Sequence, residues 1–206
     1  MYKKLIITFE GIEGSGKSLH IQNAANYLKK RKISFIRIRE PGGSKNAEKI
    51  RKLILNNKSK FNKNTDLLLY FAARSENVEN IINKNYKRRL ILIDRFTDST
   101  FAYQHYGMGV DKRIIQLINN YLLKKINVSF TFLHIVNEKN LKHRLLKRKV
   151  LNRYDKFKYS FYKKVQKGFV NRARLNKKKY LTINSNIEIN KNKKIIINKI
   201  NKILNI

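Results

Sequence analysis

One short segment near the amino terminus constrains this chain more than any other. Residues 11–18 read G-I-E-G-S-G-K-S and fit the pattern G-x-x-x-x-G-K-[ST] in full. The glycines let successive backbone N–H groups point at phosphate oxygens without a Cβ in the way. The segment follows an apolar run and precedes a helical pattern, so the positive end of the helix dipole adds to the site. The sequence therefore predicts a loop that binds nucleotide phosphates.

The residue types in this loop have separate expected roles. We expect Lys17 to reach the β and γ phosphates and the Ser18 hydroxyl to coordinate Mg²⁺. A chance glycine-rich turn is the alternative, and the strand before it and the helix after it argue against that. The expected nucleotide-binding residues are Gly11, Ile12, Glu13, Gly14, Ser15, Gly16, Lys17 and Ser18.

The rest of the chain alternates short apolar runs with longer helical patterns. We expect strands at 5–10, 35–40, 90–94, 130–136 and 179–184. We expect helices at 19–32, 65–86 (with Thr65 as N-cap), 112–126, 138–149, 157–178 and at the carboxyl end. This alternation predicts an α/β fold with a parallel sheet covered on both faces, and ligands at the carboxyl ends of the strands. No repeat or linker divides the chain, so one domain over residues 1–206 is expected.

Composition excludes several classes of site. Cysteine is absent, which rules out a disulfide scaffold, thiolate catalysis and cysteine-based zinc sites. The scattered histidines share no metal-ligand spacing, so no structural metal is expected. No apolar stretch reaches the roughly 18 residues that span a bilayer. The start of the chain reads as a strand rather than a signal peptide. We therefore expect a soluble, cytoplasmic protein with no membrane partner.

The charge of the chain is unusual. Lys and Arg number 48 against 13 Asp and Glu, a formal net charge of +35. Nucleic-acid binding is one explanation, because such a surface displaces counterions from phosphates. The other is an AT-rich coding sequence, which inflates Lys, Asn and Ile together. The basic residues are spread along the whole chain, so we favour the compositional explanation and expect only non-specific charge effects on nucleic acids.

Three further clusters follow predicted strands or lie on one helix face. The first, at 39–43, is R-E-P-G-G. In the second, Tyr70 and Arg74 are four residues apart and share a helix face. A stacked ring and a guanidinium could together read a nucleobase, although a core Tyr and a solvated Arg would fit the same spacing. In the third, Arg95 follows Asp94 at a strand end, where it could clamp a phosphate in a bidentate manner.

The phosphate loop alone fits ATPases, GTPases, helicases and small-molecule kinases. The base-reading signature N-K-x-D of GTPases is absent, and the chain is short. A small kinase is the simplest class of protein that fits these observations. A small P-loop kinase for nucleosides or for other nucleoside monophosphates, a basic ATPase that binds nucleic acid and an inactive copy remain as alternatives.

The segments FEGIEGSGKS, REPGG, LLYFAAR, DRFTDSTFAYQ and NRYD resemble, in this order and spacing, bacterial thymidylate kinases (dTMP kinases). The resemblance runs over about residues 5–175. It implies a P-loop kinase fold with a five-stranded parallel sheet, a mobile lid at about 144–156, and usually a homodimer. It also implies transfer of the γ-phosphoryl group of ATP to dTMP, giving dTDP, with Mg²⁺. The product then supplies dTTP synthesis.

The resemblance assigns roles by position. The implied catalytic residues are Lys17, Arg95, Glu13, Arg148 and Arg153, and the implied metal ligands are Ser18 and Asp94. The implied substrate-binding residues are Arg39, Pro41, Tyr70, Arg74, Arg95, Ser99, Thr100, Tyr103 and Gln104. In this scheme Arg74 reads thymine and Tyr103 crowds the sugar 2′ position.

The sequence departs from the family at two places. Tyr70 stands where the family usually has a stacking Phe, and Phe71 competes for that role. The lid reads N-R-Y-D from Asn152 where D-R-[FYI]-E is common. The phosphate loop carries no arginine, so a lid arginine must supply charge in the transition state, and Arg148 and Arg153 are equal candidates. The acceptor phosphate has a second pKa of about 6 and is already ionised, so no general base is required.

Overall fold

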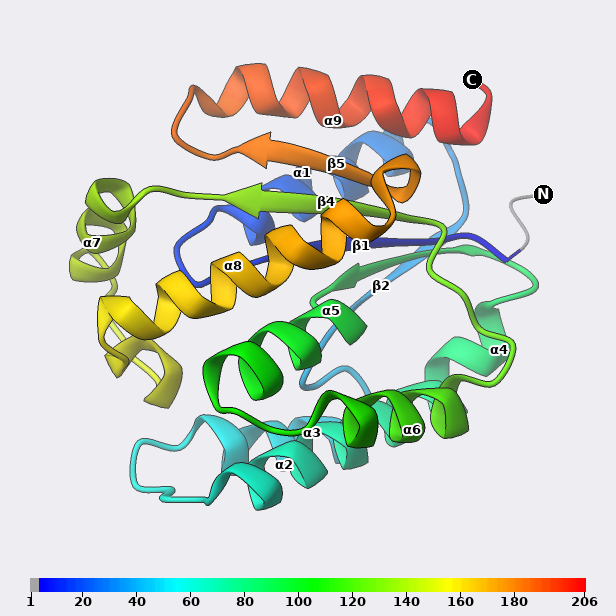
Figure 1. Ribbon diagram of the computed structural model, residues 1–206. Coiled ribbons are helices and arrows are strands. Elements are labelled where there is room, and N and C mark those ends of the chain that lie inside the picture. Colours follow the sequence, from blue (N-terminus) through cyan, green and yellow to red (C-terminus); the bar gives the residue numbers. More distant parts are fainter. Residues whose placement is uncertain (1–3) are drawn as a thin grey trace.

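The computed structural model describes residues 4–206. Within that range a parallel sheet has the strand order β2-β3-β1-β4-β5 (Figure 1). The strands are β1 (Ile6–Gly11), β2 (Phe35–Arg39), β3 (Leu90–Asp94), β4 (Phe130–Ile135) and β5 (Tyr180–Asn184). All five agree with the predicted strands to within a residue at most ends. The five-stranded α/β fold is confirmed.

The helices cover both faces of this sheet. They are α1 (Lys17–Lys30), α2 (Lys45–Leu55), α3 (Lys63–Asn77), α4 (Asn83–Asn85), α5 (Thr97–Thr100), α6 (Lys112–Leu123), α7 (Glu138–Leu146), α8 (Tyr159–Leu175) and α9 (Ile189–Leu204). Two π-helical segments, Val78–Ile82 and Phe101–Gly107, continue α3 and α5. Short 3₁₀ turns lie at Arg153–Lys156 and Lys177–Lys179. None of the helices in the described residues is long and apolar enough to cross a membrane.

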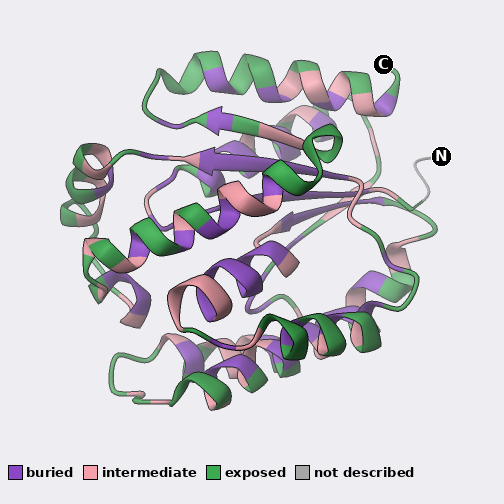
Figure 2. Cartoon of the chain, in the orientation of Figure 1, coloured by how far each residue is buried: buried purple, intermediate pink, exposed green. Residues whose placement is uncertain are grey.

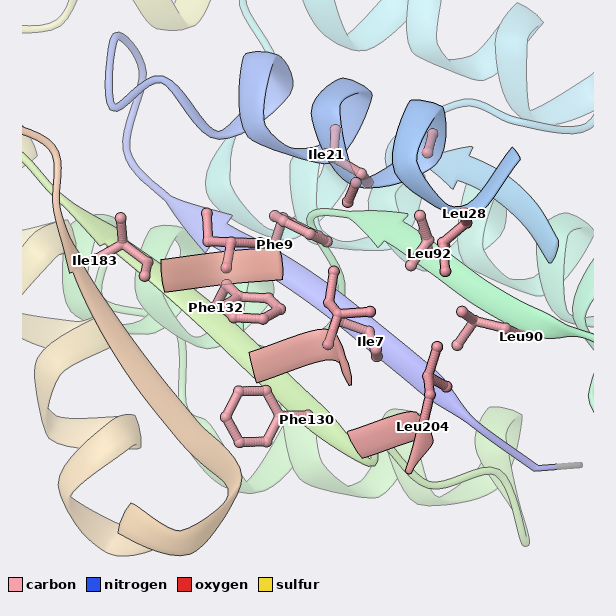
Figure 3. Close-up of a cluster of buried hydrophobic side chains, with 14 residues drawn as sticks. Ile7, Phe9, Ile21, Leu28, Leu90, Leu92, Phe130, Phe132, Ile183 and Leu204 are labelled. Atoms are coloured by element: carbon pink, nitrogen blue, oxygen red, sulfur yellow. The ribbon is translucent and has the colours of Figure 1, made fainter. Parts of the chain in front are cut away.

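Strand side chains alternate between two apolar layers, as the pleat requires. Ile7 and Phe9 of β1 point to the layer formed with α1 and α9, which Figure 3 shows. Ile6 of the same strand points to the opposite layer, with Ile91 and Ile93 of β3. The inner strands β1, β3 and β4 are almost entirely buried, whereas the edge strands β2 and β5 are only partly buried and the helices expose their outer sides (Figure 2). Cover on both faces explains why the inner strands read as continuous apolar runs.

Two helix predictions were wrong. The helix predicted from Thr65 begins earlier, because the Asn62 side chain accepts hydrogen bonds from the N–H groups of Asn64 and Thr65 and is the true N-cap. That helix also does not run on as one α-helix to 86. It ends at Asn77, whose side chain accepts from Ser44 N–H and donates to the Gly42 carbonyl. Helix α2 was not predicted at all, although Ser44 caps it by accepting from Ala47 N–H.

Candidate functional site

The phosphate loop (residues 11–18) lies between β1 and α1 at the carboxyl edge of the sheet. Gly11, Gly14 and Gly16 all have positive φ, at 141°, 65° and 80°. A Cβ at Gly11 would lie 2.5 Å from the His134 carbonyl oxygen, so only glycine fits there. The loop thus has the glycine-dependent backbone geometry that a phosphate-binding turn before a helix requires. Its binding of nucleotide phosphates stays a prediction.

Lys17 is buried within this loop, and its Nζ donates to the Ile12 carbonyl oxygen at 3.3 Å. Burial, aided by the nearby Arg95 charge, lowers the pKa of Lys17 to about 8. A lysine whose charge is poorly compensated gains most from a bound anion. The loop is therefore ready for a polyphosphate.

A pair of oxygen ligands lies beside the loop, where α1 begins and β3 ends. The Ser18 hydroxyl donates to Asp94 Oδ2 at 2.9 Å. The other carboxylate oxygen, Asp94 Oδ1, is buried and has no hydrogen-bond partner among the described residues. A hydroxyl and a carboxylate with a free oxygen are the donors that Mg²⁺ prefers. The residues present fit that ion.

Arg95 follows β3 and returns toward the loop. Its Nη1 donates to the Gly11 carbonyl at 2.8 Å and its Nη2 to Glu13 Oε1 at 2.9 Å. Its φ of 65° is in the left-handed region, which non-glycine residues adopt at a cost of about 1–3 kcal/mol. Tyr103 donates its hydroxyl proton to Glu13 and stacks its ring 5.1 Å from the Arg95 guanidinium. The backbone is thus strained where it brings a cation to the mouth of the loop.

Glu10, the residue just before the loop, holds this strained turn in place. Its carboxylate accepts from Phe96 N–H at 2.7 Å and from the Ser99 hydroxyl at 2.6 Å. Burial, with the Asp98 charge nearby, raises the pKa of Glu10 to about 7. Sequence reasoning missed this residue. An acid inside an otherwise apolar strand was the available signal.

A cavity of about 60 Å³ opens beside Arg95, and we name it the Arg74 cavity. Its lining residues are Glu13, Glu40, Pro41, Arg51, Leu55, Tyr70, Arg74, Arg95, Phe96, Ser99, Tyr103, Gln104, Asn152 and Tyr154. Most of the predicted substrate residues therefore meet here. Arg39 and Thr100 do not. Arg39 is exposed and pairs with Glu48, whereas Thr100 is buried inside α5.

Arg74 enters this cavity from α3 in a fixed position. Its Nε and Nη2 lie 2.9 and 2.8 Å from Glu40 Oε2, and its Nη1 donates to Asn119 Oδ1 at 2.9 Å. Both members of the ion pair are almost completely buried. Burial raises the pKa of Glu40, and the Arg74 charge opposes that shift. Glu40 was missed in the sequence, although it lies between the two residues of R-E-P that were singled out.

The structure also distinguishes the two aromatic candidates on α3. Tyr70 lines the Arg74 cavity and meets the Tyr154 ring edge-on at 6.1 Å. Phe71 packs in the apolar core with Leu67 and Phe101. Of the two rings, only Tyr70 is placed beside the cavity.

The segment at residues 144–156, the expected lid, is held mainly by side-chain pairs. Arg148 pairs with Asp155, and Arg153 pairs with Asp66 of α3. Tyr154 also donates to Asp66 and closes one side of the Arg74 cavity. Neither arginine lines that cavity. Each carries its charge against an acid rather than at the phosphate loop.

A different arginine of this region does touch the loop. Arg144, at the end of α7, donates from Nη1 to the Gly14 carbonyl at 2.9 Å and from Nη2 to the Ser185 carbonyl at 2.5 Å. It fixes α7 against the loop and against the end of β5. The catalytic candidates from the sequence did not include it.

A phosphate loop, an arginine at the neighbouring strand end and a polar cavity beyond it define a P-loop kinase that acts on a nucleoside monophosphate. Comparisons with known proteins make this more specific. The family model for thymidylate kinase matches residues 9–196. The chain belongs to the thymidylate kinase family.

Individual relatives agree. The thymidylate kinase of Acholeplasma laidlawii is 35% identical over 96% of this chain and 99% of its own length. The thymidylate kinase of a Sulfurihydrogenibium species is 37% identical over 93% of this chain and 94% of its own length. The crystal structure of thymidylate kinase from Ehrlichia chaffeensis superposes with a TM-score of 0.78, at 29% identity, over 98% of both chains. The resemblance found in the motifs is confirmed.

Proposed function

We propose that this protein transfers the γ-phosphoryl group of ATP to dTMP, giving dTDP and ADP. One observation carries the proposal: Arg95 contacts the phosphate loop at Gly11 and also lines the Arg74 cavity. A cation in that place faces the donor phosphate on one side and the acceptor phosphate on the other. In-line transfer requires such an arrangement, because the protein contributes positioning and charge rather than covalent chemistry.

Each residue then has a physical task. The loop N–H groups and Lys17 hold the β and γ phosphates, and Arg95 holds the phosphate of dTMP. Glu13 orients Arg95 and Tyr103 through two hydrogen bonds. Ser18 and Asp94 would hold Mg²⁺, which neutralises charge on the transferred group. Arg74 reads the thymine edge while Tyr70 flanks the ring, and Tyr103 leaves no room for a 2′-hydroxyl.

We further propose that residues 144–156 form a lid that opens to admit dTMP. The Arg74 cavity, at about 60 Å³, is far below the roughly 300–1,000 Å³ of ordinary ligand sites. Asn152 and Tyr154 of this segment line it, so their movement would enlarge it. Of the two lid arginines, Arg148 is the better candidate for the transition state. Its side chain is 36% exposed, against 16% for Arg153, which is tied to α3 by Asp66.

A homodimer is also part of the proposal. Three neighbouring helices expose large apolar side chains, namely Leu53 of α2, Leu68 of α3 and Ile114, Leu117 and Tyr121 of α6. Figure 1 shows α2, α3 and α6 side by side below the sheet. An apolar face of this kind marks an interaction surface, and a second copy buries it symmetrically. We expect Leu117→Glu to give a monomer in light scattering, whereas Leu175→Glu, on the equally exposed end of α8, leaves the dimer intact.

The reaction is tested with purified protein, ATP, Mg²⁺ and a panel of nucleoside monophosphates. We expect dTMP to be the preferred acceptor. Because one methyl group is worth about 1–3 kcal/mol in an apolar pocket, dUMP should react roughly 10–200 times less efficiently. Ribonucleotides should react more slowly still. Faster phosphorylation of AMP or CMP would overturn the assignment, as would a strongly salt-sensitive ATPase activity that nucleic acid stimulates without dTDP formation. Arg95→Ala should remove the activity and the exposed Arg88→Ala should not.

A further inference from the structure

A second cavity, of about 250 Å³, lies on the other side of α5 from the Arg74 cavity. It is enclosed by α5, α6, the carboxyl end of α8 and the sheet, where Thr8 and Thr131 form its floor. Figure 1 shows α5 between α8 and α6 on the near face of the sheet. We name it the Asn119 cavity. The proposed reaction makes no use of it.

A residue in the cavity wall carries a buried donor without a partner. Asn119 is 4% exposed and lines the cavity, and its Nδ2 has no hydrogen-bond partner among the described residues. The orientation of this amide is fixed by chemistry. Its oxygen must face Arg74, since a guanidinium can only donate. The NH₂ group must therefore face away from Arg74, and a buried donor left unpaired is destabilising.

The charges around this donor favour an anion. Asp98 is the one acid that lines the cavity within the described chain, and its two oxygens already accept from Arg172 Nε at 3.0 Å and from the Tyr180 hydroxyl at 2.6 Å. Lys124 and Lys179 also line the cavity, and neither forms an ion pair in residues 4–206. The wall therefore offers two free cations and an amide donor, and no free carboxylate.

We propose that the Asn119 cavity binds a small phosphate-bearing anion, and that this binding is coupled through Asn119 to Arg74. An anion that accepts from Asn119 Nδ2 polarises the amide and strengthens the hydrogen bond that its oxygen accepts from Arg74. Arg74 is then held more firmly away from a base in the Arg74 cavity. The coupling to dTMP rests on the proposed function, whereas binding of the anion does not.

Binding is tested first without any nucleotide. The side-chain NH₂ signal of Asn119 is followed by NMR while inorganic phosphate or ribose 5-phosphate is added. A saturable shift of that signal is expected, and the two probes show whether the sugar adds affinity. Asn119→Asp keeps the acceptor for Arg74 and removes the donor, so calorimetric titration of this variant should show binding of neither probe. The double variant Lys124→Gln/Lys179→Gln should weaken binding about tenfold. Lys125→Gln, at an exposed neighbouring position, should leave binding unchanged.

The coupling is measured next. With the better probe at saturation, the Kd for dTMP should rise about fivefold, and by linkage dTMP should weaken the probe by the same factor. No saturable shift of the Asn119 signal, or a shift unchanged in the lysine double variant, would overturn the binding site. An unchanged Kd for dTMP would overturn the coupling. A protein that binds the probe but no dTMP would instead contradict the proposed function.

Discussion

The phosphate loop and the segment at residues 144–156 both contribute basic side chains to the proposed mechanism, but these side chains are held by different forces. The loop is fixed by backbone geometry: glycines at positive φ, a turn leading into α1 and a buried Lys17. In the proposed lid, the two arginines are held by ion pairs, Arg148 with Asp155 and Arg153 with Asp66. A loop fixed in this way could bind the phosphates of ATP without rearranging. In the proposed mechanism a lid arginine moves to the transferred phosphoryl group only after dTMP has bound. The contacts that hold this arginine before then must therefore be able to break.

The largest effect is expected at the lid. Arg148→Ala should lower kcat by about 10³-fold or more, the range for an arginine that stabilises the transferring phosphoryl group. Arg153→Ala should act mainly on the KM for dTMP, because it releases the lid from Asp66. Steady-state kinetics with Lys149→Ala, an exposed neighbour, as the control would separate the two. A larger loss of kcat in Arg153→Ala than in Arg148→Ala would assign the transition-state charge to Arg153 instead.

The next largest effect belongs to the loop. Lys17→Met should lower kcat by about 10²–10³-fold, as removal of one preorganised donor to developing charge does. Its thermal unfolding midpoint should not fall, because a buried charge without a close acid partner is replaced by an apolar chain of similar length. Lys29→Met on the exposed side of α1 is the matched control and should keep full activity. Retained activity in Lys17→Met would show that the loop does not hold the reacting phosphate.

The two regions also differ in how far the sequence predicted them. Backbone-determined features follow from residue type and local order, so the strands, the glycine loop and the position of Arg95 were all predicted. Contacts between distant side chains do not follow in this way. Glu40 was overlooked because its partner Arg74 lies 34 residues away along the chain.

The same reasoning accounts for the predicted residues that lie elsewhere. Arg39 is the last residue of β2, and its exposed side chain meets Glu48 instead of entering the Arg74 cavity, which Glu40 lines. Thr100 follows Ser99 on a helix and turns into the core instead of the cavity. The helix expected to begin at Thr65 is capped instead by Asn62, whose side chain accepts from Thr65 N–H. What the sequence left open was therefore the choice of face and partner, which packing decides.

A smaller effect is expected on the free energy of unfolding, at Glu10 just before the phosphate loop. The pKa of Glu10 is about 7 in the fold and 4.5 as its ordinary value, so the folded state binds more protons between these two values. Its contribution to the free energy of unfolding is present below pH 4.5 and is lost as the pH rises through about 7, on the order of 3 kcal/mol. Glu10→Gln should therefore gain stability relative to the parent between pH 5 and pH 8. Urea unfolding at both values measures this, and a difference that does not change with pH would contradict it.

The smallest effect is expected in the pH dependence of kcat/KM, which distinguishes Lys17 of the loop from the arginines of the lid. In the free protein the pKa of Lys17 is about 8, so above that value an increasing share of the protein has lost the charge that meets the donor phosphates. The kcat/KM for ATP should accordingly fall above pH 8, by about tenfold at pH 9, because this parameter reports groups of the free enzyme. Bound phosphates favour the charged lysine, so kcat should stay level to a higher pH. The lid contributes arginines, whose guanidinium groups keep their charge throughout such an assay. Lys17→Arg should therefore flatten the decline in kcat/KM above pH 8. Arg148→Lys should leave the midpoint of that decline unchanged. A midpoint that moves in Arg148→Lys would assign the titrating cation to the lid instead.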